Sequence, residues 1–425
     1  MEHKIAVIVI QENMMIGGIE TYVFDLIKKV KKDNNTMVWV KKHNARVCES
    51  FKPELYDGKV IIWNSITIQK IKKLISEKNI ERCIIITFDM FQFASADILK
   101  ARVKNALIET YYFIPHFVGR TYYLEENFKN SYLKKKTKKR TSKIIKKMIE
   151  NSNIRFFETT HIKTLNSKYN TKLELNNYRL WVPQKGLNER EFDKSSRKKV
   201  FYRDYFNIVT VSRFEFPHKG YLIGLLKSFE ILKRKHPNLH LTVIGYGDGK
   251  NRIESLIDSF DVETKKAIHL IGQVSPELLD EYYLDANLNI SAAGCCLKGA
   301  ALGVLSLPVR HYTYNCETYD YLPEGNNSLL SKESGKPIEK FIERTIKMPF
   351  EEYLEKSQVS FDYYKNISNC YYDYSELYNR SNHSSLNPKD YALIKTISKL
   401  YKLHIFRIRF LSLFNRIIRK IKRKG

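Results

Sequence analysis

The chain has 425 residues, more than a single compact core usually holds, and this length suggests two domains. Hydrophobic residues make up 43% of the sequence and only 11 residues are proline, which excludes an intrinsically disordered chain. The formal net charge of +27 predicts an anionic partner, which can be membrane lipid, nucleic acid or a phosphorylated substrate.

Cysteine spacing and hydropathy further restrict the class of protein to which the chain can belong. The six cysteines form no CxxC pair, zinc-ligand spacing or disulfide framework, so free thiols in a reducing cytosol are expected and no metal site is predicted. The apolar run at residues 4–10 is far shorter than a signal-peptide core and is expected to be a strand. No apolar stretch approaches the roughly 18 residues of a membrane-spanning helix, which favours a soluble or peripheral protein.

The first half of the chain alternates short apolar runs with helical patterns. This rhythm is typical of βαβ units and predicts a parallel, doubly wound α/β sheet. Strands are expected at residues 4–10, 36–40, 60–63, 82–87 and 105–112, with a weaker one at 156–160 and a last one, followed by a turn, at 180–187.

Three residues in this half follow predicted strands. Gly17 and Gly18 precede a helix at 21–32, where glycine lets the backbone approach a ligand, although a tight turn would also explain them. His116 follows the fifth strand, at the edge where parallel sheets bind ligands, so it is either a catalytic residue or a structural hydrogen-bonding residue.

Residues 134–148 form a strongly basic segment. Its cations meet no acidic residue before Glu150, and Ile144, Ile145 and Met148 give the predicted helix one narrow apolar stripe. A solvated helix face is one explanation. Repulsion among the cations favours the other, contact with an anionic membrane surface.

The middle of the chain carries a candidate anion site. Residues 206–212 are expected to form a buried strand, with Arg213 at its carboxyl end. Lys219 then opens a helix at 221–233. Two cations that converge on a helix N-terminus at this edge of a sheet suit a diphosphate, whereas the alternative is a basic surface turn.

The second half repeats the βαβ rhythm. Strands are expected at 240–244, 268–271 and 288–290, and the stretch 291–309 predicts a glycine turn, a helix of small residues and a further strand. Backbone amides from Gly294 onward are suited to hold an anion, although small residues also allow a helix to pack close to a sheet.

Several motifs occur in a fixed order along residues 4–345. They are Gly-Gly-Ile-Glu after the first strand, a Pro-x-x-Gly turn before a linker, Ser-Arg-x5-Lys-Gly, Val-Ile-Gly-x-Gly, Leu-Ile-Gly-x-Val and a Ser-x-x-Gly…Leu-Pro-Val block. Together they resemble family-4 glycosyltransferases of the GT-B fold. The resemblance implies two Rossmann-like domains that face each other across a cleft and transfer a sugar from a nucleotide donor with retention of configuration, usually without a metal.

The resemblance also implies roles for single residues. Arg213 and Lys219 would bind the donor diphosphate, and His116 would lie near the donor sugar as a catalytic residue. Gly17 and Gly18 would line the cleft from the other domain. The backbone at Gly294 and Cys295 would meet the sugar or the phosphate. The nucleotide sugar is a substrate, so no separate cofactor is expected.

The sequence departs from this family at two positions. Family members carry two glutamates eight positions apart, and alignment on Ser291, Gly294 and Pro308 places Ala293 and Ala301 there. A carboxylate that accepts hydrogen bonds from ribose hydroxyls contributes roughly 1.5–3 kcal/mol. The two alanines therefore put catalytic competence in question.

The C-terminal region extends beyond the two-sheet rhythm. In residues 401–424, apolar residues recur at spacings of three and four between basic residues, without an acidic residue, which predicts an amphipathic helix on anionic lipid. The expected organisation is an N-terminal Rossmann-like acceptor-side domain at 1–187, a linker at 188–204, a nucleotide-sugar domain at 205–348, a crossover helix region at 349–369 and a basic helical tail at 370–425.

Two function classes follow. The first is a cytoplasmic glycosyltransferase, peripheral on the inner face of a bacterial cell membrane, that extends a lipid-linked or polysaccharide acceptor in capsule, O-antigen or exopolysaccharide biosynthesis. Segments 134–148 and 401–424 would hold it on the anionic membrane. The second is a non-catalytic GT-B homologue that acts as a scaffold or partner subunit in the same pathway. No nucleic-acid partner is expected, because the basic segments lack interleaved aromatic residues or a recognised module.

Overall fold

The computed structural model describes residues 4–14, 18–112, 131–151, 154–156, 190–325 and 335–369, with single positions between 162 and 172 and most of 386–396. The chain divides into two compact units. Unit 1 comprises residues 1–187 with 370–425, and unit 2 comprises residues 188–369. Each unit is described by itself.

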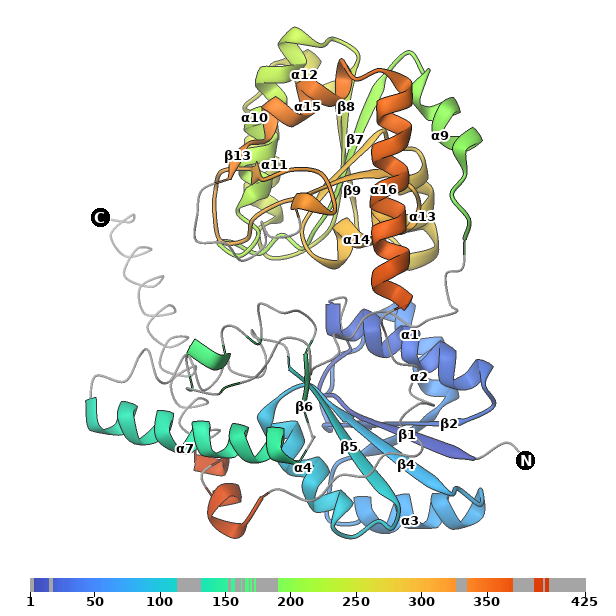
Figure 1. The fold of residues 1–425 in the computed structure, drawn as a ribbon, viewed down its shortest axis with the longest axis vertical. Helices are drawn as coiled ribbons and strands as arrows, with labels where there is room; N and C mark the ends of the chain where they lie inside the picture. The colour runs from blue at the N-terminus through green and yellow to red at the C-terminus, as the bar shows by residue number, and fades with distance from the viewer. Residues whose placement is uncertain are drawn as a thin grey trace, which may run out of the picture. The chain divides into compact units, whose positions relative to one another are not determined.

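Unit 1 is built around a six-stranded parallel sheet in the order β3-β2-β1-β4-β5-β6, with helices on both faces (Figure 1). The five stronger strands predicted in this half are confirmed. The weaker one, predicted at 156–160, begins at Ile154, two residues before its predicted start, and positions 157–160 lie outside the described residues. The last one, at 180–187, lies outside the described residues. The strands are β1 (Ile5–Ile10), β2 (Thr36–Lys41), β3 (Lys59–Ile62), β4 (Arg82–Thr87), β5 (Ala106–Tyr112) and β6 (Ile154–Phe156). The helices are α1 (Gly18–Lys32), the 3-10 turn η1 (Glu49–Phe51), α2 (Lys52–Asp57), α3 (Thr67–Glu77), α4 (Met90–Lys100) and α7 (Ser131–Glu150).

The apolar run of β1 is continuous because helices cover both faces of the sheet. Side chains of a strand point alternately to opposite faces. Ala6 and Ile8 belong to one hydrophobic cluster, whereas Val7 and Val9 belong to a second cluster on the other face. All are buried, which explains why the strand shows no polar alternation.

Helix α7 contains the basic segment 134–148, and its apolar stripe faces the core. Ile144, Ile145 and Met148 are fully buried in the larger cluster of unit 1. This stripe is therefore covered by the protein and is not available for insertion into a bilayer. Among the side chains of the helix that the structure describes, the lysines at positions 135, 138, 139, 143 and 146 are exposed.

A segment from the end of the chain belongs to the same unit. Tyr391 donates a hydrogen bond from its hydroxyl to the buried carboxylate of Asp97 on α4, at 2.5 Å. Asp390 forms an ion pair with Lys147 on α7, with 2.6 Å between Oδ2 and Nζ. Residues 401–424 lie outside the described residues. Within the described part of the chain, no helix is long and apolar enough to cross a membrane.

Unit 2 contains a five-stranded parallel sheet in the order β11-β10-β7-β8-β9 (Figure 1). The strands predicted for the second half are confirmed. They are β7 (Phe206–Val211), β8 (Leu239–Ile244), β9 (Ile268–Gly272), β10 (Leu288–Ser291) and β11 (Leu305–Pro308), beside a small antiparallel pair, β12 (Glu317–Thr318) and β13 (Lys336–Pro337). The helices are α9 (Lys194–Phe201), α10 (Tyr221–Lys235), α11 (Lys250–Asp258), α12 (Val262–Lys266), α13 (Pro276–Leu284), α14 (Gly294–Ala301), α15 (Ile338–Ile346) and α16 (Phe350–Asn369).

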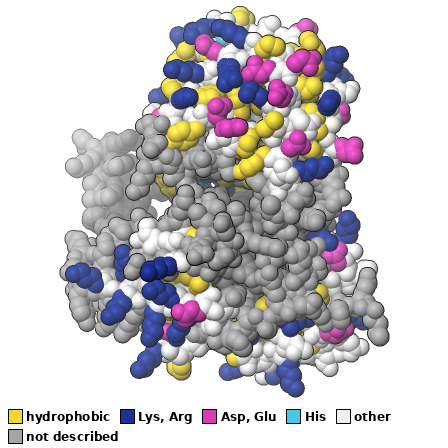
Figure 2. Space-filling model, in the orientation of Figure 1, with side chains coloured by type: hydrophobic (Ala, Val, Ile, Leu, Met, Phe, Trp, Pro, Cys, Tyr) yellow, Lys and Arg dark blue, Asp and Glu magenta, His cyan; other side chains and the backbone are white. Residues whose placement is uncertain are grey.

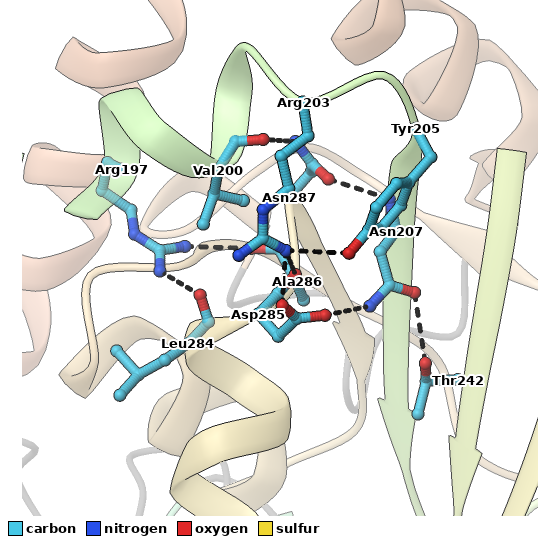
Figure 3. A network of polar contacts seen from close by, with 10 residues as sticks. All are labelled: Arg197, Val200, Arg203, Tyr205, Asn207, Thr242, Leu284, Asp285, Ala286 and Asn287. Atoms are coloured by element: carbon cyan, nitrogen blue, oxygen red, sulfur yellow. Dashed lines mark hydrogen bonds and ion pairs between the residues drawn. The ribbon is translucent and has the colours of Figure 1, made fainter. Parts of the chain in front are cut away.

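Helix α9 occupies part of the stretch that the sequence assigns to a linker. Arg197 of α9 is only 1% exposed, and its guanidinium donates to the carbonyl oxygens of Leu284 at 2.5 Å and Ala286 at 2.9 Å (Figure 3). Leu284 ends α13, where backbone carbonyls lack helical partners and a cation is favourable. The polar composition of this stretch thus serves to attach α9 to unit 2.

Further polar contacts join α9 to the first strand of the sheet (Figure 3). Arg203 pairs with the carboxylate of Asp285, and the side chain of Asn287 donates to the carbonyl of Val200 at 3.1 Å. The amide of Asn207, on β7, donates to Asn287 Oδ1 at 2.8 Å. The segment before β10 is therefore bonded both to α9 and to β7.

Candidate functional site

The strand order of unit 2 defines where a ligand is expected to bind. The chain begins at β7 and adds β8 and β9 on one side, then β10 and β11 on the other, so the order reverses between β7 and β10. Ligands of open α/β sheets bind at the carboxyl ends of strands at such a switch point. The two strand ends are joined there, because the amide of Val211 donates to Ser291 Oγ at 3.1 Å.

Arg213 follows β7 at this edge and faces an acidic residue. Its Nη1 lies 3.2 Å from Glu215 Oε1, and Glu215 Oε2 lies 3.6 Å from His218 Nδ1. The close approach of His218, followed by the charge of Arg213, lowers the pKa of Glu215, so the carboxylate is ionised at neutral pH. Glu215 lies inside the basic motif and balances part of its charge.

Lys219 is largely buried just before α10. Its Nζ lies 3.1 Å from Nδ1 of His311, a residue that follows β11. Burial lowers the pKa of Lys219 to about 8, and the charge of Arg213 adds to this shift, while Cys295 and Glu215 oppose it. Lys219 is therefore mostly protonated at neutral pH and can act as a cation toward a diphosphate.

The other strand end, after β10, leads into α14 through the backbone. Ala293 has φ 53° and ψ −130°, a conformation that L-residues rarely adopt. Gly294 is exposed at the first position of α14, with open space where a side chain would begin. This arrangement gives an anion room to approach the helix N-terminus.

Cys295 contributes its backbone and not a reactive thiol. Its carbonyl accepts hydrogen bonds from the hydroxyl of Tyr283 at 2.8 Å and from Asn289 Nδ2 at 3.3 Å, which holds the first turn of α14. The residue is partly exposed, but burial of its sulfur raises the pKa of the thiol. A protonated thiol at neutral pH is a poor nucleophile.

The two alanines that stand in place of the family glutamates both lie on the β10 side of the switch point. Ala293 precedes α14, and Ala301 is buried at the end of the helix, with 6% exposure. Glu317 lies beyond β11 and pairs with Arg310, with 2.7 Å between Oε2 and Nη1. Its carboxylate is therefore engaged on β12.

The structure brings together only part of the predicted site. Arg213, Lys219 and Cys295 lie near one another in unit 2, as their mutual effects on the pKa of Lys219 show. Gly18 is the first residue of α1. Gly17 and His116 lie outside the described residues. Among the residues that are described, no group of three or more His, Cys, Asp or Glu could hold a metal ion.

Sequence reasoning missed three residues of this site: Glu215, His218 and His311. The first two lie inside the Ser-Arg-x5-Lys-Gly motif, between its two cations, and their position could have revealed them. His311 lies more than ninety positions away in the sequence, and only its place two residues after Val309, beyond a predicted strand, gave a signal.

Comparison with known proteins agrees with this geometry. Residues 191–295 match the model of a family described as "Glycosyl transferases group 1". A glycosyltransferase from Rickettsia africae ESF-5 has a similar structure, with a TM-score of 0.56 and 16% identity over 94% of this chain and 98% of that one. HepE from Anabaena in complex with UDP gives a TM-score of 0.53 and 12% identity over 87% of this chain and 95% of that one. No curated protein sequence matches the chain.

The two parallel-sheet units and the similar structures confirm the predicted GT-B fold. The match to the glycosyltransferase family model covers residues 191–295, the segment that contains Arg213 and Lys219, and agrees with the predicted class. Together they support transfer of a sugar from a nucleotide sugar.

Proposed function

We propose that the protein is a retaining glycosyltransferase that moves a sugar from a nucleoside-diphosphate donor to a lipid-linked or surface polysaccharide acceptor. The observation that carries the proposal is the pair of cations, Arg213 and Lys219, at the carboxyl end of β7 and beside the switch point of the sheet. Preorganised cations at this place suit a diphosphate whose charge increases during the reaction. A complex of the similar protein HepE contains UDP, which is consistent with such a ligand.

The expected reaction follows from this arrangement. The bond between the sugar C1 and the diphosphate oxygen breaks, and the electron pair stays on the diphosphate, where Arg213 and Lys219 stabilise the new charge. The acceptor hydroxyl oxygen bonds to C1 on the same face, and its proton passes to an oxygen of the leaving phosphate. This route requires no carboxylate nucleophile, in contrast to the glycosidase pair.

One observation favours a second candidate, a non-catalytic scaffold or partner subunit. Alanine replaces both family glutamates, and in the described part of the site the carboxylate nearest the cations, Glu215, is paired with Arg213. A protein of this kind would bind a nucleotide sugar without transferring it.

A donor screen separates these candidates. The purified full-length chain, with membranes as the source of acceptor, is incubated with a panel of nucleotide sugars, and both binding and nucleotide release are measured. We expect one donor to bind and its nucleotide to be released, and Arg213→Ala to reduce both strongly. Binding without release supports the scaffold, whereas no binding across the panel contradicts both candidates.

We further propose that unit 1 meets an anionic membrane through charge. The apolar stripe of α7 is buried, so its five exposed lysines provide the contact, and Figure 2 shows Lys and Arg side chains on the face where α7 lies. The ion pair of Asp390 with Lys147 attaches the chain beside α7 shortly before the basic residues 401–424. Each cation near an anionic bilayer contributes about 1 kcal/mol.

Vesicle sedimentation tests this contact. Full-length protein in which Lys138, Lys139, Lys143 and Lys146 are changed to Gln should sediment less with phosphatidylglycerol vesicles than the native chain, and deletion of 401–425 should reduce sedimentation further. The control carries the same change at the exposed Lys70, Lys72 and Lys73 of α3. Equal sedimentation of the α7 variant and the control would contradict the role of α7.

A further inference from the structure

The loop that follows β11 lies directly on the start of α10 in unit 2. The amide of Tyr312 donates to the carbonyl of His218 at 3.0 Å. The rings of His218 and His311 are stacked, with centroids 4.9 Å apart. Residues 310–316 thus lie over the segment that carries the two cations of the donor site.

Two glycines of this region allow the close approach. A Cβ on Gly220 would lie 2.5 Å from the carbonyl oxygen of Thr313, and one on Gly224 would lie 2.4 Å from the amide nitrogen of Cys316. Any side chain at either position would push the loop away from α10.

An aromatic contact holds the same loop further along. The rings of Phe216 and Tyr314 are stacked at 6.4 Å, and the guanidinium of Arg252 lies 5.2 Å from the first ring and 4.8 Å from the second. Cation–π contacts of this kind favour one arrangement of the loop. The residues that follow His311 in the loop are therefore held against the start of α10 and against Arg252.

The contact between Lys219 and His311 has a defined direction. A protonated lysine has only donors, so Nδ1 of His311 accepts the hydrogen bond at 3.1 Å and the ring proton lies on Nε2. Burial, and then the charge of Lys219, lowers the pKa of His311 to about 2, so the imidazole remains a neutral acceptor at physiological pH.

Lysine places its charge at the end of a flexible four-carbon stem, and ordering that stem on ligand binding costs free energy. We propose that His311 is a positioning residue of the donor site, which orders the Lys219 ammonium beforehand so that it and Arg213 meet the same diphosphate. This inference rests on the proposed function of the site. If Lys219 and Arg213 meet different phosphates, the site should bind a diphosphate more tightly than a monophosphate, because Lys219 contributes only when the second phosphate is present.

Nucleotide binding by full-length variants tests the proposal. Dissociation constants of UDP, GDP and ADP and of their monophosphates are measured by calorimetry for the native chain, His311→Leu and His311→Asn. His311→Leu should weaken the preferred diphosphate on the order of tenfold and its monophosphate less than about twofold. His311→Asn retains an acceptor near the position of Nδ1 and should recover most of the loss. Equal diphosphate affinity of the native chain and His311→Leu would overturn the proposal, as would equal weakening of diphosphate and monophosphate.

A second measurement does not depend on nucleotides. Acetylation of Lys219 by acetic anhydride, followed by mass spectrometry across pH, reports the pKa of its amine, with the exposed Lys227 of α10 as internal reference. The groups that influence Lys219 are Arg213, Glu215, Cys295 and His311, with His218 next to it. Loss of the acceptor should shift the midpoint about 0.5–1 pH unit lower in His311→Leu and leave it unchanged in His311→Asn.

The two measurements separate a failure of the proposed function from a failure of the role of His311. If no nucleotide binds to the native chain, the proposed function fails and the role of His311 toward a diphosphate fails with it, and the acetylation midpoint then tests only whether His311 holds the Lys219 ammonium. If nucleotide binds, an unchanged midpoint in His311→Leu overturns the positioning role, and a lowered midpoint together with weaker diphosphate binding supports it.

Discussion

The two strand ends at the switch point of unit 2 differ in how they can meet a ligand. The end of β7 presents charged side chains, Arg213, Glu215 and Lys219, that contact one another or the neighbouring loop. The adjacent end of β10 presents backbone, through Ala293, Gly294 and Cys295. One end of the switch point therefore offers charged side chains to a ligand, whereas the other offers a helix N-terminus with alanine at the positions of the two family glutamates.

Removal of a cation at the end of β7 is expected to give the largest effect. Arg213→Ala should weaken binding of a nucleoside diphosphate on the order of 100-fold, since a charge-assisted contact with a phosphate is lost. Calorimetry measures the change, and Lys227→Ala, which removes an exposed cation from α10, serves as the control. A similar loss of affinity in both variants would mean that the overall positive charge of the protein, and not Arg213 and Lys219 in particular, holds the anion.

The two strand ends can meet one ligand only if β10 is held firmly beside β7. Arg197→Ala leaves the carbonyls of Leu284 and Ala286, which precede β10, without their donor. The free energy of unfolding should fall by about 2–4 kcal/mol, measured by chemical denaturation of the full chain. Lys198→Ala, at an exposed position of the same helix, should leave it nearly unchanged. Equal stability of both variants would show that this attachment is dispensable.

The protonation state of Lys219 should determine how strongly the end of β7 binds a diphosphate. Because its pKa is lowered to about 8, Lys219 is charged below that pH and loses its charge above it. Affinity for a nucleoside diphosphate should therefore fall about tenfold between pH 7.5 and 9. Lys219→Arg keeps its charge over this range and should give a flat profile. A steep profile in that variant would assign the titration to another group.

The smallest effect is expected at the end of β10. Ala293→Gly removes a Cβ from a residue at φ 53° and should raise the free energy of unfolding by up to about 1 kcal/mol. Denaturation of the full chain measures the change, with Ala292→Gly as the matched control that should destabilise. Destabilisation by Ala293→Gly would contradict the strained conformation of this turn.

Much of the fold could be predicted from local patterns. Continuous β-branched runs in β1 and β7 predicted strands buried on both faces, because the residues on either side of each strand meet different helices. The regular alternation of such runs with helical patterns predicted both parallel sheets. Arg213 and Lys219 could be identified because they lie six residues apart in one loop.

The remainder depended on contacts between distant segments. The polar stretch around Arg197 predicted a linker. The sequence does not show that Arg197 donates to carbonyls at the end of α13, which attach this stretch to unit 2. The pattern of α7 showed one narrow apolar stripe but not what covers it, since such a stripe looks the same whether a bilayer or the core covers it, and only the fold places Ile144, Ile145 and Met148 in the core.

At the candidate anion site, the sequence by itself determined the two cations and the strand that ends beside them. The tertiary structure alone decided how they are held. Glu215 balances Arg213 within the same loop, and His311 reaches Lys219 from a loop that the sheet order brings over α10. Residue types and short spacings fix local backbone geometry, whereas the partner of a buried charge is set by which strands lie side by side.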